Sequence, residues 1–286
     1  MTYLTPHLPF PSSSTSTSLP PPRSHLIISD TVASPSHFAV YHLVSAALGK
    51  ERRKVVWIDF RGEGRASWEA VLKKIGTPLP PAASPQFIHF TPSFLPFPIP
   101  TPSSSSSSSS SKNTPRLFDD NDQPTLRDTY NSIVPVIAEG SLIILDGLSE
   151  LSWIGMSAME ISKFVRAVFA RTRSSNAILV STLHADHLPL SSNVIPQTDA
   201  GTNEGELLER LLRIGQGCWW RVSHLASGRS GDVMGEISSH PLTKPIGLED
   251  SDKLNYPHIP RSNPLQYRLE SNTVRVFAKG TGRGFL

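Results

Sequence analysis

The chain has 286 residues, 38% of them hydrophobic, and a formal charge of +3 from 27 Lys and Arg against 24 Asp and Glu. This small excess permits contact with nucleic acid without requiring it, and Cys218, the single cysteine, excludes an intrachain disulfide and a cysteine-built zinc site. No apolar stretch approaches the ~18 residues of a membrane span, so we expect a cytoplasmic or nuclear protein.

Two stretches have compositions that are typical of disorder. Residues 1–22 are rich in Ser, Thr and Pro, which predicts a disordered tail, because isolated apolar residues cannot offset the entropy of ordering. Residues 91–125 contain the proline-rich run TPSFLPFPIPTP and then nine consecutive serines, which predicts a disordered insertion at a loop tip. We therefore expect residues 23–286 to form a single domain that this insertion interrupts.

Four short runs rich in Ile, Val and Leu alternate with helical patterns, as in a parallel sheet with both faces covered by helices. They span residues 25–30, 54–59, 142–146 and 176–182, and residues 85–90 predict a further strand. Helices are expected at 35–48, 68–75, 125–138, 158–173 and 206–214. Ser34 and Pro35 favour the start of the first helix, and Pro135 indicates a bend or break in the third.

The last part of the chain changes to an antiparallel pattern. Residues 218–225 alternate between apolar and polar, and a Gly-containing turn leads them into 233–237. Residues 265–269 pair in the same way with 274–277. A parallel sheet followed by such a meander is the order of RecA-type ATPase cores, so the predicted fold is α/β and RecA-like.

The phosphate loop of such an ATPase is missing. The motif G-x-x-x-x-G-K-[ST] wraps phosphates in backbone N–H groups, neutralises them with Lys and binds magnesium with a hydroxyl. The equivalent segment here, residues 30–38, contains no Gly and no Lys. Pro35 removes a backbone donor and Asp30 would repel phosphate, so we expect no nucleotide cofactor and no ATPase activity from this segment.

Other candidate sites are weak. Asp146 holds the Walker-B-like position of the magnesium-binding acid, but without a partner hydroxyl and phosphate a structural role is favoured. His184, Asp186 and His187 form H-x-D-H, yet a metal site needs three or four convergent ligands. The motif G-x-S-x-G is absent. We therefore expect no catalytic residue and no bound metal.

Four segments together resemble the family of the sixth Elongator subunit. They are HLIISDTVASPSHFAVYHLVSAAL, VVWIDFRGEG, LIILDGLSELSWIG and ILVSTLHAD, and the similarity covers about residues 24–90 and 126–280. The resemblance implies a RecA-like fold without ATPase motifs or catalytic residues. It also implies a heterohexameric ring with the fourth and fifth Elongator subunits, which binds tRNA and supports wobble uridine modification by the remaining subunits.

In RecA-like rings the loops after the fourth and fifth core strands point toward the central channel, so residues 147–157 and 184–203 are expected to face tRNA. The candidate RNA contacts in or near them are His184, His187, Arg171 and Arg173. Two alternatives stay open. One is a degenerate ATPase that borrows phosphate contacts from a neighbouring subunit, and the other is the sibling fifth subunit or another RecA-like paralogue.

Overall fold

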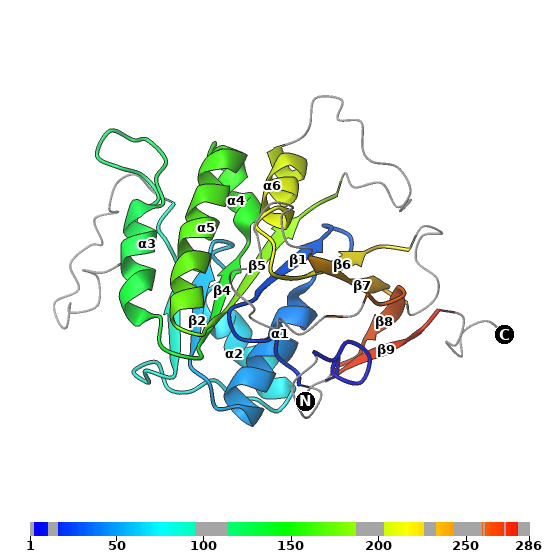
Figure 1. Cartoon of the computed structure of the whole chain (residues 1–286). Coiled ribbons are helices and arrows are strands. Elements are labelled where there is room, and N and C mark those ends of the chain that lie inside the picture. The colour runs from blue at the N-terminus through cyan, green and yellow to red at the C-terminus, as the bar shows by residue number, and fades with distance from the viewer. Residues whose placement is uncertain are drawn as a thin grey trace, which may run out of the picture.

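The computed structural model describes residues 3–10, 17–94, 114–186, 203–225, 233–242, 259, 261–271 and 273–279. Within these stretches, helices cover both faces of a nine-stranded sheet (Figure 1). None of the helices formed by these residues is long and apolar enough to cross a membrane.

The sheet has the strand order β3-β2-β4-β5-β1-β6-β7-β8-β9. The strands are β1 (His25–Asp30), β2 (Val55–Asp59), β3 (Phe87–Phe90), β4 (Leu142–Asp146), β5 (Ile178–His184), β6 (Gly217–Ser223), β7 (Gly235–Leu242), β8 (Leu265–Leu269) and β9 (Val274–Ala278). Neighbours from β3 to β6 are parallel, and those from β6 to β9 are antiparallel. The predicted RecA-like α/β fold, with a mostly parallel sheet and a C-terminal meander, is confirmed.

The helices divide between the two faces of the sheet. They are α1 (His37–Ser45), α2 (Arg65–Lys74), α3 (Arg127–Ile133), α4 (Leu148–Trp153), α5 (Ala158–Ser174) and α6 (Asn203–Leu212). One apolar core lies between the sheet and α1 with α2, and a second lies between the sheet and α3 to α6 (Figure 1). The central strands β1, β2, β4 and β5 are buried along their whole length because both of their faces are covered.

Helix boundaries differ from the predicted ones where a local feature intervenes. The first helix begins at His37 rather than at Pro35, and a π-helix, Ala46–Lys50, continues it past the expected end. Helix α3 ends at Ile133 and a short 3-10 helix, Val134–Val136, follows, because Pro135 lacks the N–H that an α-helix needs. Helix α4 lies in a segment that was expected to be a loop.

The prediction of a disordered tail over residues 1–22 is wrong for residues 3–10 and 17–22. Four apolar side chains of this segment are buried in the core that faces α1, namely Leu4, Leu8, Phe10 and Leu19. The Phe10 ring stacks on Trp220 of β6 with centroids 5.4 Å apart. The polar composition of residues 1–22 predicted disorder, but it does not show that the few apolar side chains pack on the antiparallel half of the sheet. That packing orders the segment.

The two ends of the predicted insertion are also packed. Leu117 is fully buried, and its N–H donates to the carbonyl of Ser93 at 3.1 Å. Residues 91–94 and 114–125 are thus part of the folded structure, and residues 95–113 of the predicted insertion lie outside the described residues.

The parallel strands bring their last residues to a common edge, which we call the carboxyl edge. Asp30 of β1 lies in register with His184 of β5, and Asp59 of β2 lies in register with Asp146 of β4. The opposite edge, where the same strands begin, is called the amino edge. The fold therefore concentrates buried acidic side chains where RecA-type ATPases hold nucleotide.

Candidate functional site

The turn between β1 and α1 occupies the position of a phosphate loop, but a carboxylate of the chain itself fills it. Oδ2 of Asp30 accepts hydrogen bonds from the backbone N–H of Ser36 at 2.7 Å and from its hydroxyl at 2.8 Å. Ser36 is the N-cap of α1. Amides at the start of a helix bind phosphate in nucleotide-binding folds, and here they bind Asp30 instead.

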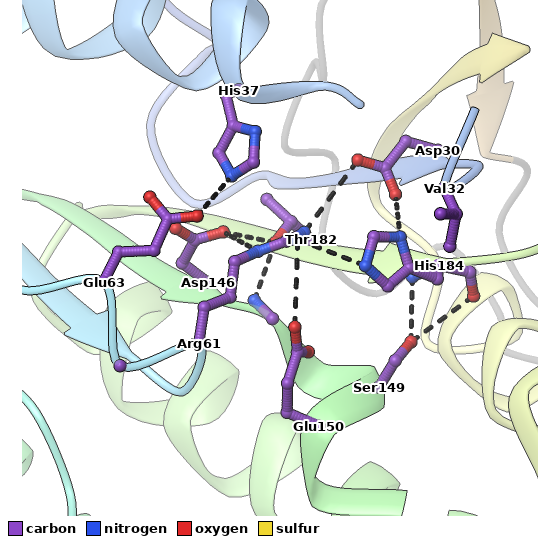
Figure 2. Close-up of polar contacts among 12 residues, drawn as sticks. Asp30, Val32, His37, Arg61, Glu63, Asp146, Ser149, Glu150, Thr182 and His184 are labelled. Atoms are coloured by element: carbon purple, nitrogen blue, oxygen red, sulfur yellow. Dashed lines mark hydrogen bonds and ion pairs between the residues drawn. The ribbon is translucent and has the colours of Figure 1, made fainter. Parts of the chain in front are cut away.

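A buried arginine provides the matching positive charge. Arg61 follows β2, and its side chain is 9% exposed. Its Nε lies 3.3 Å from Oδ1 of Asp146, Nη1 lies 3.8 Å from Oε1 of Glu150 and Nη2 lies 3.9 Å from Oδ2 of Asp30 (Figure 2). The guanidinium thus stands among three carboxylates, in the region where a nucleotide-binding fold would hold a lysine and magnesium.

The loop that carries Arg61 is fixed by the last residue of β2. The Asp59 carboxylate accepts hydrogen bonds from the N–H groups of Gly62 and Gly64, each at 2.9 Å. Asp59 is completely buried. Its role is therefore to position the loop and, through it, the Arg61 guanidinium.

Asp146 is held by three donors. Its Oδ1 accepts from the Thr182 hydroxyl at 2.6 Å and from Nε of Arg61, and its Oδ2 accepts from Nε1 of Trp57 at 3.2 Å. These bonds satisfy both oxygens, which favours the structural interpretation of this Walker-B-like acid. Across the described stretches, no group of three or more His, Cys, Asp or Glu side chains is arranged to hold a metal ion.

His184 connects Asp30 to Arg61. Its Nδ1 lies 2.6 Å from Oδ1 of Asp30, and its Nε2 lies 3.1 Å from Nη1 of Arg61 (Figure 2). In the neutral ring Nε2 accepts from the guanidinium, which can only donate, and Nδ1 carries the proton that faces Asp30. The ring is also covered by Trp153, whose indole stacks on it with centroids 5.7 Å apart.

Charge pairing sets the ionisation of this cluster. Burial by itself would raise the pKa of Asp30, but the hydrogen bond and charge of His184 and the charge of Arg61 hold it below its usual value. Burial lowers the pKa of His184, and Asp30 outweighs it, so that pKa is raised. Burial raises the pKa of Glu150 despite the nearby Arg61 charge. Charge pairing therefore outweighs burial at Asp30 and His184, whereas burial outweighs charge pairing at Glu150.

Gly147 makes the close approach of Arg61 possible. This residue has φ +84°, and a Cβ atom there would lie 2.6 Å from Cγ of Arg61 and 2.8 Å from Oε2 of Glu150. Its N–H donates to the hydroxyl of Thr182 at 2.8 Å. Gly147 therefore lets the turn after β4 fit against the guanidinium while it keeps Thr182 directed at Asp146.

Sequence reasoning missed Arg61 as the centre of this site. The signal that could have found it was the order of residues after β2, in which Arg61 stands between the buried Asp59 and the Gly62–Glu63–Gly64 turn. Parallel strands end at a common edge, so this arginine had to lie near Asp30 and Asp146. Its burial, however, depends on packing that no local pattern encodes.

The structure does not bring the predicted RNA-contacting residues together. The His184 side chain is 8% exposed and sits behind Trp153, whereas His187 lies outside the described residues. Arg171 and Arg173 are in the last turn of α5, just before β5 begins at the amino edge. The seven residues of β5 place these arginines ~20 Å from His184.

Asp186, the remaining member of the H-x-D-H pattern within the described residues, is used locally. Its carboxylate accepts a hydrogen bond from the N–H of Val32 at 3.1 Å. This contact ties the end of β5 to the turn after β1.

A scan against protein-family models and a search of curated proteins both give no match for this chain.

Proposed function

We propose that this protein is a non-catalytic subunit of the Elongator complex. In this proposal it forms a heterohexameric RecA-like ring with the fourth and fifth subunits, and the ring binds tRNA and supports wobble uridine modification by the remaining subunits in the cytoplasm and nucleus. The resemblance of the β1, β2, β4 and β5 segments to the sixth-subunit family supports the assignment. The single observation that carries the non-catalytic role is Asp30 bound to the amide of Ser36, with Arg61 behind it.

A triphosphate would meet two obstacles in this region. Its negative charge would lie beside Asp30 and Asp146, and it would have to displace the bonds that Ser36 makes to Asp30. Magnesium could reach Asp146 only if Thr182, Trp57 and Arg61 gave up their hydrogen bonds. The charge repulsion and the loss of these hydrogen bonds both cost much free energy in a buried site. This supports the role of a non-catalytic scaffold rather than that of a degenerate ATPase that borrows contacts from a neighbouring subunit.

The proposed tRNA contact is better supplied by the amino edge than by the loops at the carboxyl edge. Arg171 is exposed and Arg173 is half-buried there, and Arg23 lies close by, with its Nε donating to Oδ1 of Asn176 at 2.6 Å. Phosphate groups are bound chiefly through such positive side chains. Of the four candidate RNA contacts, we therefore propose Arg171 and Arg173, since His184 is buried and His187 lies outside the described residues.

The assembly is tested by expressing the chain alone and together with the fourth and fifth Elongator subunits. We expect native mass spectrometry to detect a six-chain complex with two copies of each protein, and calorimetry to detect no ATP binding by the isolated chain. ATP turnover by the isolated chain would contradict the non-catalytic role. Assembly with the fourth and sixth subunits instead would identify the chain as the fifth subunit.

The tRNA contact is tested on the assembled ring with Arg171→Glu/Arg173→Glu. We expect weaker tRNA binding in fluorescence anisotropy and a salt dependence whose slope falls by about 1 for each lost phosphate contact. Lys163→Glu/Arg166→Glu is the matched control, because it reverses two exposed charges on earlier turns of the same helix. Equal tRNA affinity for wild type and the Arg171/Arg173 variant would exclude this placement.

A further inference from the structure

Exposed apolar side chains gather at the carboxyl edge, outside the buried Arg61 cluster. Five large apolar residues are strongly exposed among those the structure describes, and three of them belong to this edge: Val32 at 70%, Trp153 at 59% and Met159 at 46%. We call these three residues, together with the acidic side chains beside them, the Trp153 surface. An exposed tryptophan in such a group is typical of an interaction site.

The indole of Trp153 is held in place rather than free. It stacks on the ring of His184 with an interplanar angle of 13°, and its Nε1 donates to Oε1 of Glu204 at 2.8 Å. Two contacts on different elements therefore fix an aromatic group that is still 59% exposed. A side chain that is ordered before binding loses little entropy when a partner covers it.

Hydrogen bonds connect the other two apolar residues to the same region. The N–H of Val32 donates to Asp186, which lies two residues after His184. Ala158, next to Met159, donates its N–H to Oδ1 of Asn203 at 3.0 Å, and Asn203 precedes Glu204. The turn after β1, the end of β5 and the starts of α5 and α6 thus form a connected surface.

A carboxylate bonds to two of the apolar residues of the Trp153 surface and follows the third in the sequence. Asp186 accepts from Val32, Glu204 accepts from Trp153, and Glu160 follows Met159 in the sequence. The chain contains no Lys or Arg between Arg173 and Arg210 and none in residues 31–36 or 147–157. Such a surface attracts positive charge and repels the phosphates of a nucleic acid.

We propose that the Trp153 surface docks a protein partner whose contact segment carries an apolar side chain flanked by Lys or Arg. The apolar side chain packs on Trp153, and the basic groups pair with Asp186, Glu204 and Glu160. This inference rests on the proposed function, because it identifies the surface on which a neighbouring ring subunit sits. Charge complementarity selects a basic protein segment over RNA.

The test measures assembly of the chain with the fourth and fifth Elongator subunits. We expect Trp153→Ala to weaken assembly at least about 30-fold, which is the effect of losing a hot-spot residue. The matched control is Val71→Ser/Leu269→Ser, which changes two exposed apolar residues on other elements and should leave assembly unchanged. Circular dichroism and thermal unfolding of each isolated variant verify that it is folded.

A second arm removes charge and keeps the hydrogen-bond acceptors. Asp186→Asn and Glu204→Gln can still accept from Val32 and Trp153, so the surface keeps its shape. We expect the double variant to assemble several-fold more weakly than wild type in low salt and to lose much of the salt dependence of assembly.

The outcomes separate the inference from the proposed function. Failure of the wild-type chain to assemble contradicts the proposed function, and the inference falls with it. Normal assembly of the wild type and of the Trp153→Ala variant overturns the inference alone. Trp153-dependent binding of a single-stranded RNA oligonucleotide to the isolated chain also overturns the inference, since a base would then stack on the indole. So does an increase in acrylamide quenching of Trp153 when residues 188–198 are replaced by a Gly/Ser linker, because the chain's own segment would then cover the surface.

Discussion

The two edges of the parallel sheet carry opposite charge. At the carboxyl edge Arg61 is buried among carboxylates, and the surface around Trp153 is apolar and acidic. At the amino edge the basic side chains lie where the strands begin and are at least partly exposed. The end where RecA-type ATPases bind phosphate is therefore acidic in this chain, and positive charge is exposed at the opposite end.

Hydrogen bonds connect the segments of the basic amino edge. Arg53 donates from Nη1 to the carbonyl of Gly140 at 3.0 Å, and the N–H of Gly140 donates to the carbonyl of Ser175 at 3.0 Å. The basic residues near the starts of these strands are Arg23, Lys50, Arg52, Arg53, Lys54, Arg171 and Arg173. Glu51, which pairs with Arg53, and Glu139 are the acids among them. Positive charge therefore dominates this edge.

The largest expected effect comes from removing the buried cation. Arg61→Met leaves Asp30, Asp146 and Glu150 without their counter-charge, and we expect the free energy of unfolding to fall by about 3–5 kcal/mol in urea titrations. Arg210→Met, which breaks an exposed ion pair with Glu206, should change it by less than about 0.5 kcal/mol. Equal effects of the two changes would contradict the contrast between a buried and an exposed arginine.

A smaller effect is expected at the glycine that faces the guanidinium. Gly147→Ala combines a left-handed backbone with a clash against Arg61, so we expect a loss of about 2–4 kcal/mol. Gly62→Ala has a similar φ, +71°, and no atom within 4 Å of its Cβ, so strain alone should cost about 1–2 kcal/mol. If thermal and urea unfolding give the same loss for both variants, Arg61 does not constrain the turn after β4.

The smallest effect is a change in pH dependence. Burial raises the pKa of Glu150, so the folded state holds this proton more tightly than the unfolded state and stability falls as pH rises from the ordinary value of Glu through the raised one. We expect Glu150→Gln to flatten the decline in urea stability over that range. The raised pKa of His184 causes a separate decline in stability above the ordinary pKa of His, which the Glu150→Gln variant should keep. A pH profile of this variant identical to that of wild type would contradict the role of Glu150.

Much of the fold could be predicted because its signals are local. The runs of Ile, Val and Leu in β1, β2, β4 and β5 indicate buried strands whatever their order in the sheet. The alternation of apolar and polar residues in β6 is typical of a strand with one covered face. Residues 30–38 contain no phosphate-loop glycine or lysine, and this is visible without any structure. The Pro135 break in the third helix was likewise indicated by the covalent chemistry of proline.

The site could not be predicted in the same way, because its contacts join residues far apart in the chain. Asp30 and His184 meet only because β1 and β5 are neighbours in the sheet, and Arg61 reaches them from the loop after β2. His184 was predicted to contact RNA because it lies at the end of a strand. The sequence does not reveal that Trp153 stacks on it and covers it. The buried N-terminal segment escaped prediction for the same reason.

A RecA-like sheet without a phosphate loop follows from the order of residues alone, since strand patterns and missing glycines are properties of consecutive residues. Tertiary packing alone brings Asp30 to the amide of Ser36 and places Arg61 among three carboxylates. The same packing places Arg171 and Arg173 at the end of the sheet opposite His184. Charge pairing depends on distance and burial, and strand order and packing set both of these together.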